Sequence, residues 1–353
     1  MLYLKPKMRF IYINSENLYP PDTHLIQGLR ELGYDLIEIT EKKDSVSYRR
    51  LLGQLKKVVQ KEDVVIVGYP SPVLAICARF TVKNKIFFNA LSSQYEANVI
   101  SRGESGPLFL WGIKSWIIDF LSFHLSTKVL LESDAQREFV SSNFFISKKN
   151  LVRSFSGLDE KNFFYENNVK KLDVFTVLFR GRFLPESGIL TIIETTKKLE
   201  DTGVVVRIIG AGFMYREVND LLAKLKPKNL EMINKTLSFG DLRTKMQECH
   251  ISLGQLACHP RLERTLPCKL FESLALGLPY LTGRNKAVFE ILEENKNCIV
   301  VNQGDSDDLA RKILELKDNK EILDRIGKAG YDLYKQKLTS KKLAEKVIED
   351  CFI

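Results

Sequence analysis

The sequence lacks the marks of small disulfide-bonded, repetitive or disordered proteins. Its 353 residues include six cysteines and no CxxC pair, and the chain is far longer than the domains that disulfides hold together. No internal repeat with a period of about 20 to 50 residues recurs, and no segment has low complexity. We therefore expect a globular protein of a reducing compartment, the cytoplasm.

The cysteines and histidines also lack the spacing of a metal site. Cys249-His250, Cys258-His259 and Cys268 fall within one short segment, but their separations match no common zinc module. Core cysteines and loop histidines are the ordinary interpretation, so we expect no metal and no other cofactor. The first residues, MLYLKPKMRFIYI, lack a cleavable leader, because a short basic lead passes directly into an apolar run typical of a first strand.

Acidic residues are fewer than basic residues, and the formal net charge is +9. A basic protein can bind nucleic acids, anionic lipids or phosphorylated substrates. The basic residues are dispersed, the aromatic residues lie in apolar runs, and no signature of a nucleic-acid-binding domain accompanies them. We therefore expect no nucleic acid partner, which leaves phosphorylated small molecules and an anionic membrane surface.

What the sequence does contain is a regular alternation of short apolar, β-branched runs with amphipathic segments of about a dozen residues. This alternation predicts an α/β fold with parallel sheets covered on both faces. Because 353 residues exceed the roughly 250 to 300 at which one core stops growing, we expect two Rossmann-like domains. We place them at residues 1–168 and 169–335, followed by a helix over 336–353 that packs back toward the first domain.

The predicted strands and helices follow from these runs. The predicted strands are Arg9–Ile13, Tyr34–Ile39, Val64–Gly68, Ile86–Asn89, Lys128–Glu132, Leu151–Phe155, Val174–Phe179, Val204–Ile209, Leu230–Ile233, Ile251–Leu253, Tyr280–Thr282 and Ile299–Val301. The predicted helices of the first domain are Thr23–Leu32, Ser45–Gln60, Pro72–Phe80, Leu108–Leu125 and Ala135–Asn143.

The segment Pro267–Pro279, PCKLFESLALGLP, carries the strongest functional signal. It places Lys269 and Glu272 one helical turn apart at the start of a short apolar helix, beside free amides that suit an anion. An isolated pair of this kind is also typical of a structural ion pair on a surface helix. A second motif favours a binding site, because GRFLPESG follows the strand predicted at Val174–Phe179 and opens a new helical pattern.

Glycines follow two of the predicted strands of the second half. Gly181 comes after the first, and Gly210 and Gly212 come after the second. Glycine allows tight turns and the close approach of a phosphate to the backbone. These positions are therefore candidates for contacts with a phosphorylated ligand.

Five segments of the second half occur in the order typical of one enzyme family. They are VLFRGRFLPESGI, VVVRIIGAG, ISLGQL, PCKLFESLALGLPYLTG and NCIVVNQGDSDDLA, within residues 174–334. This half resembles the donor-binding domain of the group 1 (family four) glycosyltransferases of the GT-B fold, and NALSSQYEANVISR, KVLLESDAQREFV and SFSGLDEKNFF in the first half follow the same succession. The resemblance implies two Rossmann-like domains facing across a cleft, a nucleotide-sugar donor, and transfer of the sugar with retained anomeric configuration.

The resemblance also implies roles for single residues. Breaking the bond between sugar and nucleoside diphosphate leaves negative charge on the phosphate, which cations stabilise in a site without metal. Arg182 and Lys269 would supply these cations, and Glu272 would accept the ribose hydroxyls. Thr236 and Leu237 would contact the nucleobase, and Gly181, Gly210 and Gly212 belong to the same donor site.

Three positions depart from the family pattern. Ser187 stands where a lysine commonly precedes the glycine of the Gly-Arg loop, so one phosphate cation is missing. Arg264 stands where many members carry a glutamate that holds the donor sugar, and the nearest glutamate is Glu263. Arg264 is a candidate replacement cation, with a solvated loop arginine as the alternative. Lys235 occupies the place of a glycine before the base-contacting loop.

The first domain would hold the acceptor. After the first predicted strand, NLYPPD replaces the usual pair of glycines with a stiffer loop. His24 then follows at the start of a helix, as an acceptor contact or as a helix-cap histidine on the surface. Further acceptor-side candidates follow a strand end, where open parallel sheets bind ligands. They are Asn89, Ser92, Tyr95, Glu96 and Arg102.

Two helices bear on membrane association. Residues 45–61, SVSYRRLLGQLKKVVQK, mix basic and apolar residues as an interfacial helix does, although a solvated helix with an inward apolar stripe has the same pattern. The predicted helix Leu108–Leu125 is rich in aromatic residues, but Lys114 and Asp119 argue against a membrane span. We interpret it as a buried helix with an exposed aromatic edge that serves a lipid-linked acceptor.

Together these patterns predict a retaining, metal-independent hexosyltransferase that uses a nucleotide sugar. Its acceptor would be a glycan or lipid-linked intermediate of surface polysaccharide or glycoconjugate synthesis, at the cytoplasmic face of the membrane. One alternative is a catalytically weak or inactive homologue that acts as a donor-binding or partner subunit. A second is a sugar-nucleotide epimerase of the same fold, which would require acid and base groups in the cleft.

Overall fold

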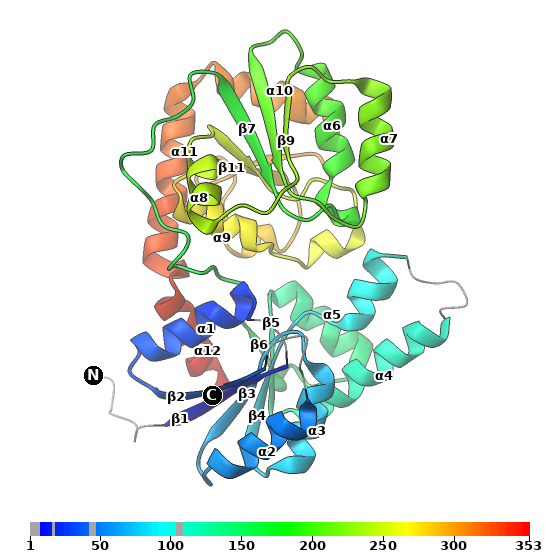
Figure 1. The fold of residues 1–353 in the computed structure, drawn as a ribbon, viewed down its shortest axis with the longest axis vertical. Coiled ribbons are helices and arrows are strands. Elements are labelled where there is room, and N and C mark those ends of the chain that lie inside the picture. The colour runs from blue at the N-terminus through cyan, green and yellow to red at the C-terminus, as the bar shows by residue number, and fades with distance from the viewer. Residues whose placement is uncertain (1–7, 16–17, 42–46, 104–108) are drawn as a thin grey trace. The chain divides into compact units, whose positions relative to one another are not determined.

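The computed structural model describes residues 8–15, 18–41, 47–103 and 109–353, which divide into two compact units (Figure 1). Unit 1 comprises the described residues of Met1–Asp159 together with Thr339–Ile353, and unit 2 comprises Glu160–Leu338. Each unit has its own six-stranded parallel sheet, and the fold is therefore α/β in both.

The sheet of unit 1 has the strand order β2-β1-β3-β4-β5-β6. Its strands are β1 (Arg9–Asn14), β2 (Asp35–Thr40), β3 (Val64–Val67), β4 (Lys85–Leu91), β5 (Lys128–Leu131) and β6 (Leu151–Arg153). Its helices are α1 (Pro20–Glu31), α2 (Tyr48–Val58), α3 (Pro72–Thr81), α4 (Phe109–Leu125), α5 (Asp134–Phe144) and α12 (Ser340–Cys351), with a π-helix at Glu96–Ser101.

Alternate residues of each strand in unit 1 face different sets of helices. Ile11 and Val65 belong to a buried cluster with residues of α2, α3, α4 and α5. Phe10 and Val64, one residue earlier on the same strands, belong to a second cluster with residues of α1 and α12. This is the two-residue period of a strand buried on both faces. The carboxy-terminal helix α12 therefore completes the core of unit 1.

The sheet of unit 2 has the strand order β12-β11-β10-β7-β8-β9. Its strands are β7 (Phe175–Arg180), β8 (Val204–Ile209), β9 (Leu230–Ile233), β10 (Ile251–Leu253), β11 (Tyr280–Gly283) and β12 (Ile299–Val301). Its helices are α6 (Ile189–Lys198), α7 (Tyr215–Leu225), α8 (Phe239–Gln247), α9 (Cys268–Ala275), α10 (Ser306–Lys317) and α11 (Lys320–Leu333). The order reverses beside β7, so the loops after β7 and β10 flank a switch point where parallel sheets bind ligands.

Two expectations about unit 1 need correction. The loop NLYPPD is only partly a loop, because Pro20, Pro21 and Asp22 form the first turn of α1, while Asn17 lies outside the described residues. Proline fits the first helical position, and the Asp22 carboxylate accepts the backbone N–H of Tyr19 at 3.2 Å.

The interpretation of residues 108–125 as a buried helix is only partly right. One face of α4 packs inward, but an apolar stripe on the opposite face is exposed, with Leu110 at 72% and Ile117 at 46%. Leu108 lies outside the described residues. None of the described helices combines the length and apolar character that crossing a bilayer requires.

Candidate functional site

Two glycine turns contact each other at the carboxyl ends of β7 and β8. Gly181 and Gly210 have φ angles of +152° and +155°, which residues with a side chain rarely adopt. A Cβ atom added at Gly210 would lie 1.9 Å from the carbonyl oxygen of Gly181, and one at Gly212 would lie 2.6 Å from the amide nitrogen of Phe183. The close packing of the two loops therefore requires glycine at all three positions.

Lys269, the second residue of α9, extends its buried amine toward this turn. The nitrogen is 3.7 Å from the centre of the Phe179 ring and 3.5 Å from the carbonyl oxygen of Gly254. A Cβ at Gly181 would lie 3.0 Å from the same amine. Burial is the main cause that lowers the pKa of Lys269 to about 7, and the charge of Arg180 is the second. An anionic ligand would favour the protonated amine.

Glu272 lies one helical turn after Lys269 and is 1% exposed. Its Oε2 atom is 3.0 Å from Nη1 of Arg180, the last residue of β7. The alignment is that of an ion pair and not of a hydrogen bond, and Oε2 has no hydrogen-bond partner among the described residues. Burial raises the pKa of Glu272, and the charges of Arg180 and Lys269 oppose this rise. Leaving a buried carboxylate oxygen without a hydrogen bond is costly, and a ligand hydroxyl would remove that cost.

Arg180 also lies at this candidate site, and sequence reasoning missed it. Its side chain is 28% exposed, and its guanidinium carbon lies 5.9 Å from the centre of the Phe163 ring. The available signal was its place directly before Gly181, at the end of a buried strand. An arginine at such a strand end reaches the same edge of the sheet as the residues that begin α9.

The remaining predicted donor residues lie around this edge. Arg182 is exposed on the turn after Gly181, and its side chain makes no ion pair or hydrogen bond with the described parts of the chain. Arg264 is half-buried and ends the turn that precedes α9. Thr236 is exposed and Leu237 is half-buried, in the loop that follows β9.

Ser187 has a structural role at the position where the sequence lacks a cation. Its buried hydroxyl donates to the carbonyl oxygen of Leu184 at 2.6 Å and accepts the backbone N–H of Ile189. The neighbouring Glu186 pairs with Arg261 at 2.8 Å, which joins the loop after β7 to the loop after β10. These contacts fix the loop that carries Arg182.

In unit 1, Asp22 is the centre of a buried polar network at the carboxyl ends of β1 and β4. Its carboxylate accepts hydrogen bonds from the hydroxyl of Tyr12 at 2.6 Å, from the amide of Tyr69 at 2.8 Å and from the side chain of Asn89 at 3.2 Å. Burial raises the pKa of Asp22 to about 6. Asn89, predicted to face the acceptor, therefore holds the start of α1.

The other acceptor-side candidates also contact their own unit. Glu96 is buried and accepts the side-chain amide of Gln136 at 2.6 Å, and the backbone of Tyr95 donates to Asp119 at 2.8 Å. Ser92 is buried, and Arg102 donates to the side chain of Asn98 at 3.0 Å. These contacts hold residues 92–102 against other parts of unit 1.

His24 does not lie on the surface, so the alternative of an exposed helix-cap histidine is wrong. Its side chain is 1% exposed, and neither ring nitrogen has a hydrogen-bond partner in the described structure. The ring packs on Gly157, where a Cβ would lie 2.4 Å from it. Burial lowers the pKa of His24 to about 3, so the ring is neutral.

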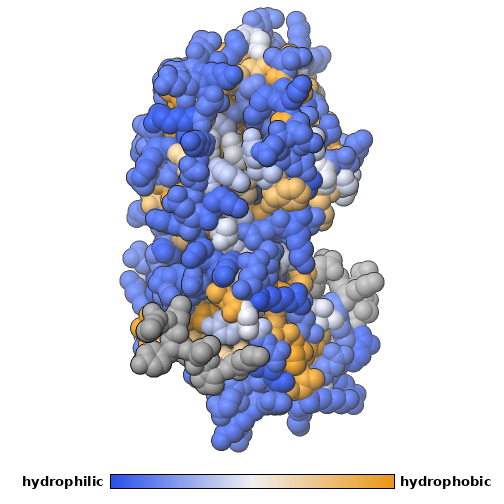
Figure 2. Space-filling view, turned by 90° about the vertical axis from the view of Figure 1, so that its left-hand side faces the viewer, coloured by the Kyte–Doolittle hydropathy of each residue, from blue (hydrophilic) through white to orange (hydrophobic). Residues whose placement is uncertain are grey.

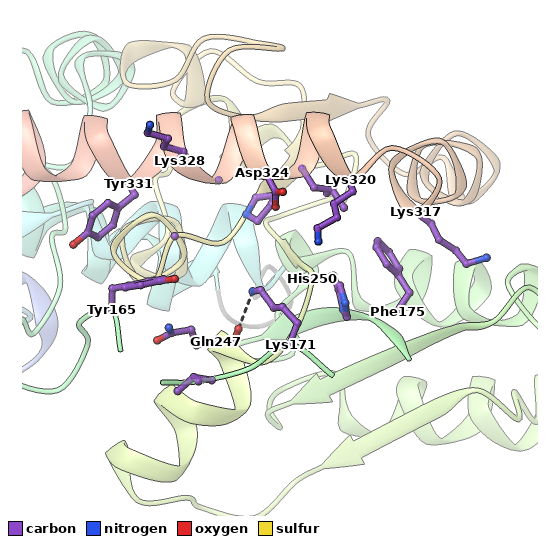
Figure 3. Close-up of a pocket in the computed structure, with 15 residues that line it drawn as sticks. Tyr165, Lys171, Phe175, Gln247, His250, Lys317, Lys320, Asp324, Lys328 and Tyr331 are labelled. Carbon is purple, nitrogen blue, oxygen red and sulfur yellow. Dashed lines mark hydrogen bonds between the residues drawn. The ribbon is translucent and has the colours of Figure 1, made fainter. Parts of the chain in front are cut away.

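A cavity of about 560 Å³ opens at the other ends of the strands of unit 2, and it contains none of the predicted donor residues (Figure 3). The start of β7, the start of β10 and α11 line it. Lys171 points into it, and its amine donates to the carbonyl oxygens of Gln247 at 2.8 Å and Cys249 at 2.6 Å. Although Lys171 as a whole residue is exposed, desolvation lowers its pKa to about 8. The chain's own carbonyl groups satisfy this amine, so Lys171 fastens the segment before β7 to the end of α8.

The predicted absence of a metal site concerns the segment with Cys249, Cys258 and Cys268. The ring of His250 accepts the backbone N–H of Thr176 at 3.0 Å, and Cys249 is buried. Among the residues that the structure describes, no three His, Cys, Asp or Glu side chains are placed to hold a metal ion.

Comparison with known proteins gives a family and a fold. Residues 160–333 match the model of the family described as glycosyl transferases group 1. An uncharacterized glycosyltransferase of Methanocaldococcus jannaschii is 24% identical over 159 residues, a stretch that spans 45% of this chain and 43% of that protein. The chain thus aligns with less than half the length of that relative.

Solved structures resemble the chain over nearly its whole length. Sucrose-phosphate synthase of Thermosynechococcus elongatus superimposes with a TM-score of 0.74 at 12% identity, covering 97% of this chain and 98% of the other. HepE of Anabaena, in complex with UDP and glucose, gives a TM-score of 0.71 at 13% identity with the same coverage. A glycosyltransferase of Rickettsia africae gives 0.70 at 14% identity, with 98% of each chain covered. Residues 160–333 therefore belong to the group 1 glycosyltransferases, and the chain has the GT-B fold.

Proposed function

We propose that the protein is a retaining hexosyltransferase that moves a sugar from a nucleotide-sugar donor to a glycan or lipid-linked acceptor in surface polysaccharide or glycoconjugate synthesis. The observation that carries the proposal is the cluster of Arg180, Lys269 and Glu272 beside the glycine turns of unit 2. It combines two cations with a buried carboxylate oxygen that lacks a hydrogen bond. That HepE, a protein of the same fold, binds UDP and glucose supports a nucleotide sugar as the donor.

The proposed chemistry follows from these groups. Departure of the nucleoside diphosphate places negative charge on phosphate oxygens, and Lys269 and Arg182 stabilise that charge without a metal ion. Arg180 joins them when a ligand enters, and Arg264 is a further candidate. Glu272 accepts the ribose hydroxyls, which supply the hydrogen bond that its Oε2 atom lacks.

Nucleotide binding tests the donor site directly. Isothermal titration calorimetry with a panel of nucleoside diphosphates should give binding for one base, with UDP as the first choice. We expect Arg182→Ala and Glu272→Ala to abolish measurable binding, because each removes a charged contact to the ligand. Lys320→Ala, a change in the cavity at the other strand ends, serves as the control and should bind as the wild type does. Unchanged affinity in both site variants would refute the site.

The second candidate function is a donor-binding subunit without turnover of its own. The observation that favours it is Ser187, whose buried hydroxyl occupies the place of a cation. Release of the sugar from the donor in the presence of a membrane extract separates the two functions. A protein that binds the nucleotide and never releases or transfers the sugar is the subunit, and one that turns over is the transferase.

We also propose that the protein works at the cytoplasmic face of a membrane, where a lipid-linked acceptor would be found. Its net charge of +9 supports an anionic surface as the partner. Cell fractionation tests this proposal. Recovery of the protein with washed membranes at low salt, and its release at high salt, is the expected result, and recovery in the soluble fraction at low salt contradicts it.

A further inference from the structure

The helix α4 has an unusual distribution of residues for a helix on the surface of a unit. Its face toward the π-helix at Glu96–Ser101 carries small and polar residues, among them Ser115, Asp119 and Ser122, all buried. Ser115 accepts the side chain of Asn98 at 3.3 Å. A surface helix normally turns polar residues outward. Here polar residues lie inside.

The outward face of α4 is correspondingly apolar. Residues three and four apart form one stripe along it, and the exposed fractions fall from 72% at Leu110 to between 40% and 46% at the others. The stripe consists of Leu110, Ile113, Ile117 and Leu121, interrupted by Lys114, and exposed Trp111 flanks it. Contiguous exposed apolar residues mark an interaction surface.

The neighbouring helices extend this surface. α3 packs against α4 and exposes Phe80 at 79%, and α2 packs against α3 (Figure 1). Figure 2 shows apolar residues gathered in a patch on unit 1, within a mostly hydrophilic surface. We call α2, α3 and the outward stripe of α4 the α2–α4 surface.

The charge of the α2–α4 surface is of one sign. The exposed cations are Arg49, Arg50, Lys56, Lys57, Arg79 and Lys114, of which Arg50 pairs with Glu41 at 2.8 Å, just before α2. Asp119 is the only acid within residues 48–58, 72–81 and 109–125, and it is buried. A second copy of the chain would bring these cations against one another, which disfavours self-association through this surface. An anionic partner with an apolar interior fits it.

We infer that the α2–α4 surface docks on an anionic lipid bilayer, with the stripe of α4 inserted among the acyl chains near the headgroups. Lys114 lies with its amine 5.0 Å from the centre of the Trp111 ring, and this pairing suits the interface, where tryptophan and a long lysine side chain both reach the headgroups. Helices of this kind lie in the membrane plane and do not cross it. The inference deepens the proposed membrane partner and rests on that part of the proposed function.

Vesicle binding by the full-length protein tests the inference. Vesicles of phosphatidylcholine mixed with phosphatidylglycerol are compared with vesicles of phosphatidylcholine alone, by co-sedimentation at low and high salt. We expect binding to the anionic vesicles, weakened by salt, and at least about tenfold weaker binding for the double variant Leu110→Gln and Ile117→Gln. Val174→Gln, which changes an exposed valine of unit 2, is the matched control and should bind as the wild type does.

Tryptophan fluorescence locates the contact. The chain has two tryptophans, and Trp116 stacks on Phe120 and Phe144 inside unit 1, so Trp111 is the one that a bilayer would reach. Anionic vesicles should shift the emission to shorter wavelength in the wild type. Trp111→Phe should abolish the shift and keep the binding.

Two results would overturn the inference. One is equal vesicle binding by the wild type and the double variant, and the other is no binding by the wild type together with a stable oligomer that the double variant dissociates. UDP affinity of the double variant is measured alongside and should equal that of the wild type. A wild-type protein that binds UDP and no anionic vesicles would contradict the membrane inference alone, and one that binds the vesicles and no UDP would contradict the donor site alone.

Discussion

Among single residues, Arg180 has a partner in the structure that its place in the sequence did not indicate. In the sequence it follows the strand predicted at Val174–Phe179, and in the structure it ends β7 and pairs with the buried Glu272. A ligand that supplies hydroxyls to Glu272 would release the guanidinium, which is part-exposed and could then contact a phosphate. Arg180 would thus compensate for the cation that is missing at Ser187.

Arg180→Met tests this role. Because hydrogen bonds to charged groups contribute about 1.5 to 3 kcal/mol, the variant should bind UDP roughly tenfold to a hundredfold more weakly. Uridine, which has no phosphate, should lose much less affinity. Calorimetric titration of both ligands measures the difference, with Arg243→Met as the control, since Arg243 pairs with Glu166 elsewhere in unit 2. Equal losses for UDP and uridine would assign Arg180 to the ordering of Glu272 alone.

Lys269 predicts a pH dependence of donor binding. Its pKa of about 7 means that the amine is charged below pH 7 and increasingly neutral above it. A diphosphate requires the charged amine, so affinity should be constant below about pH 7 and fall above it by up to about tenfold per pH unit. Titrations with UDP-glucose in two buffers of different ionisation enthalpy should detect the uptake of a proton.

The conservative variant provides the control for this pH dependence. In Lys269→Arg the cation stays charged over the whole range, so affinity should no longer change with pH. Wild-type affinity that is the same at about pH 6.5 and pH 8.5 would contradict the assignment of Lys269 as a phosphate contact.

The sequence predicted the helical turn with Lys269 and Glu272 because their spacing on a short helix is local information. It did not predict Arg180 as a partner, because an ion pair between a strand end and a helix depends on which strand lies beside that helix. The prediction of a surface position for His24 was wrong for a similar reason. Its place near a helix start favoured the surface, but Gly157, distant in sequence, provides the space that buries it.

At the scale of elements, α4 predicts a pH dependence of stability. Burial raises the pKa of Asp119 on its inner face to about 7, from a usual value near 4. Between these values the unfolded chain loses a proton and the folded chain keeps it, so the stabilising contribution is complete below about pH 4 and is lost as pH rises through 7. At ~1.4 kcal/mol per pKa unit, this change amounts to roughly 4 kcal/mol.

Asp119→Asn removes this titration. The variant should gain stability relative to the wild type as pH rises from about 4 to 8, because only the wild type loses the contribution of its protonated carboxyl. Asparagine still offers an oxygen to the backbone N–H of Tyr95. Urea unfolding at several pH values measures the difference. Ser115→Ala, on the same face, should follow the wild-type pH profile, and a parallel profile for Asp119→Asn would show that Asp119 is ionised in the folded chain.

Strands were the elements that the sequence predicted best. The strands predicted at Val204–Ile209, Leu230–Ile233, Ile251–Leu253 and Ile299–Val301 are confirmed with the same bounds. Most are short apolar runs bounded by polar residues or glycine. The change from apolar residues to these residues marks both ends of each strand. The sequence could not predict the faces of α4, because some of its inner partners lie on the π-helix at Glu96–Ser101, which has no local signal.

For the whole molecule, the packing of α1 on α12 joins the two ends of the chain. A Cβ at Gly28 would lie 2.1 Å from the carbonyl oxygen of Ser340 and 2.5 Å from the Cβ of Ala344. Gly28→Ala should therefore destabilise unit 1 by about 2 kcal/mol through overpacking. Gly53→Ala, on α2 with nothing within 4 Å, should instead stabilise it by about 0.5 to 1 kcal/mol.

Urea unfolding followed by circular dichroism compares the two variants. Effects of opposite sign are expected, since the substitution is the same and only the surroundings differ. Equal stability of Gly28→Ala and the wild type would mean that α12 shifts freely on α1, and that its packing contributes little to unit 1.

The return of α12 to unit 1 has a consequence for biosynthesis. A ribosome releases the first strands of unit 1 early, but the helix that covers Phe10, Leu25 and their neighbours emerges only after unit 2. At ~5 to 20 residues per second, all of unit 2 takes on the order of 10 to 40 s to appear in between. During that interval α12 does not yet cover its part of one apolar face of the first sheet. Unit 2 can finish folding before unit 1, although it begins later.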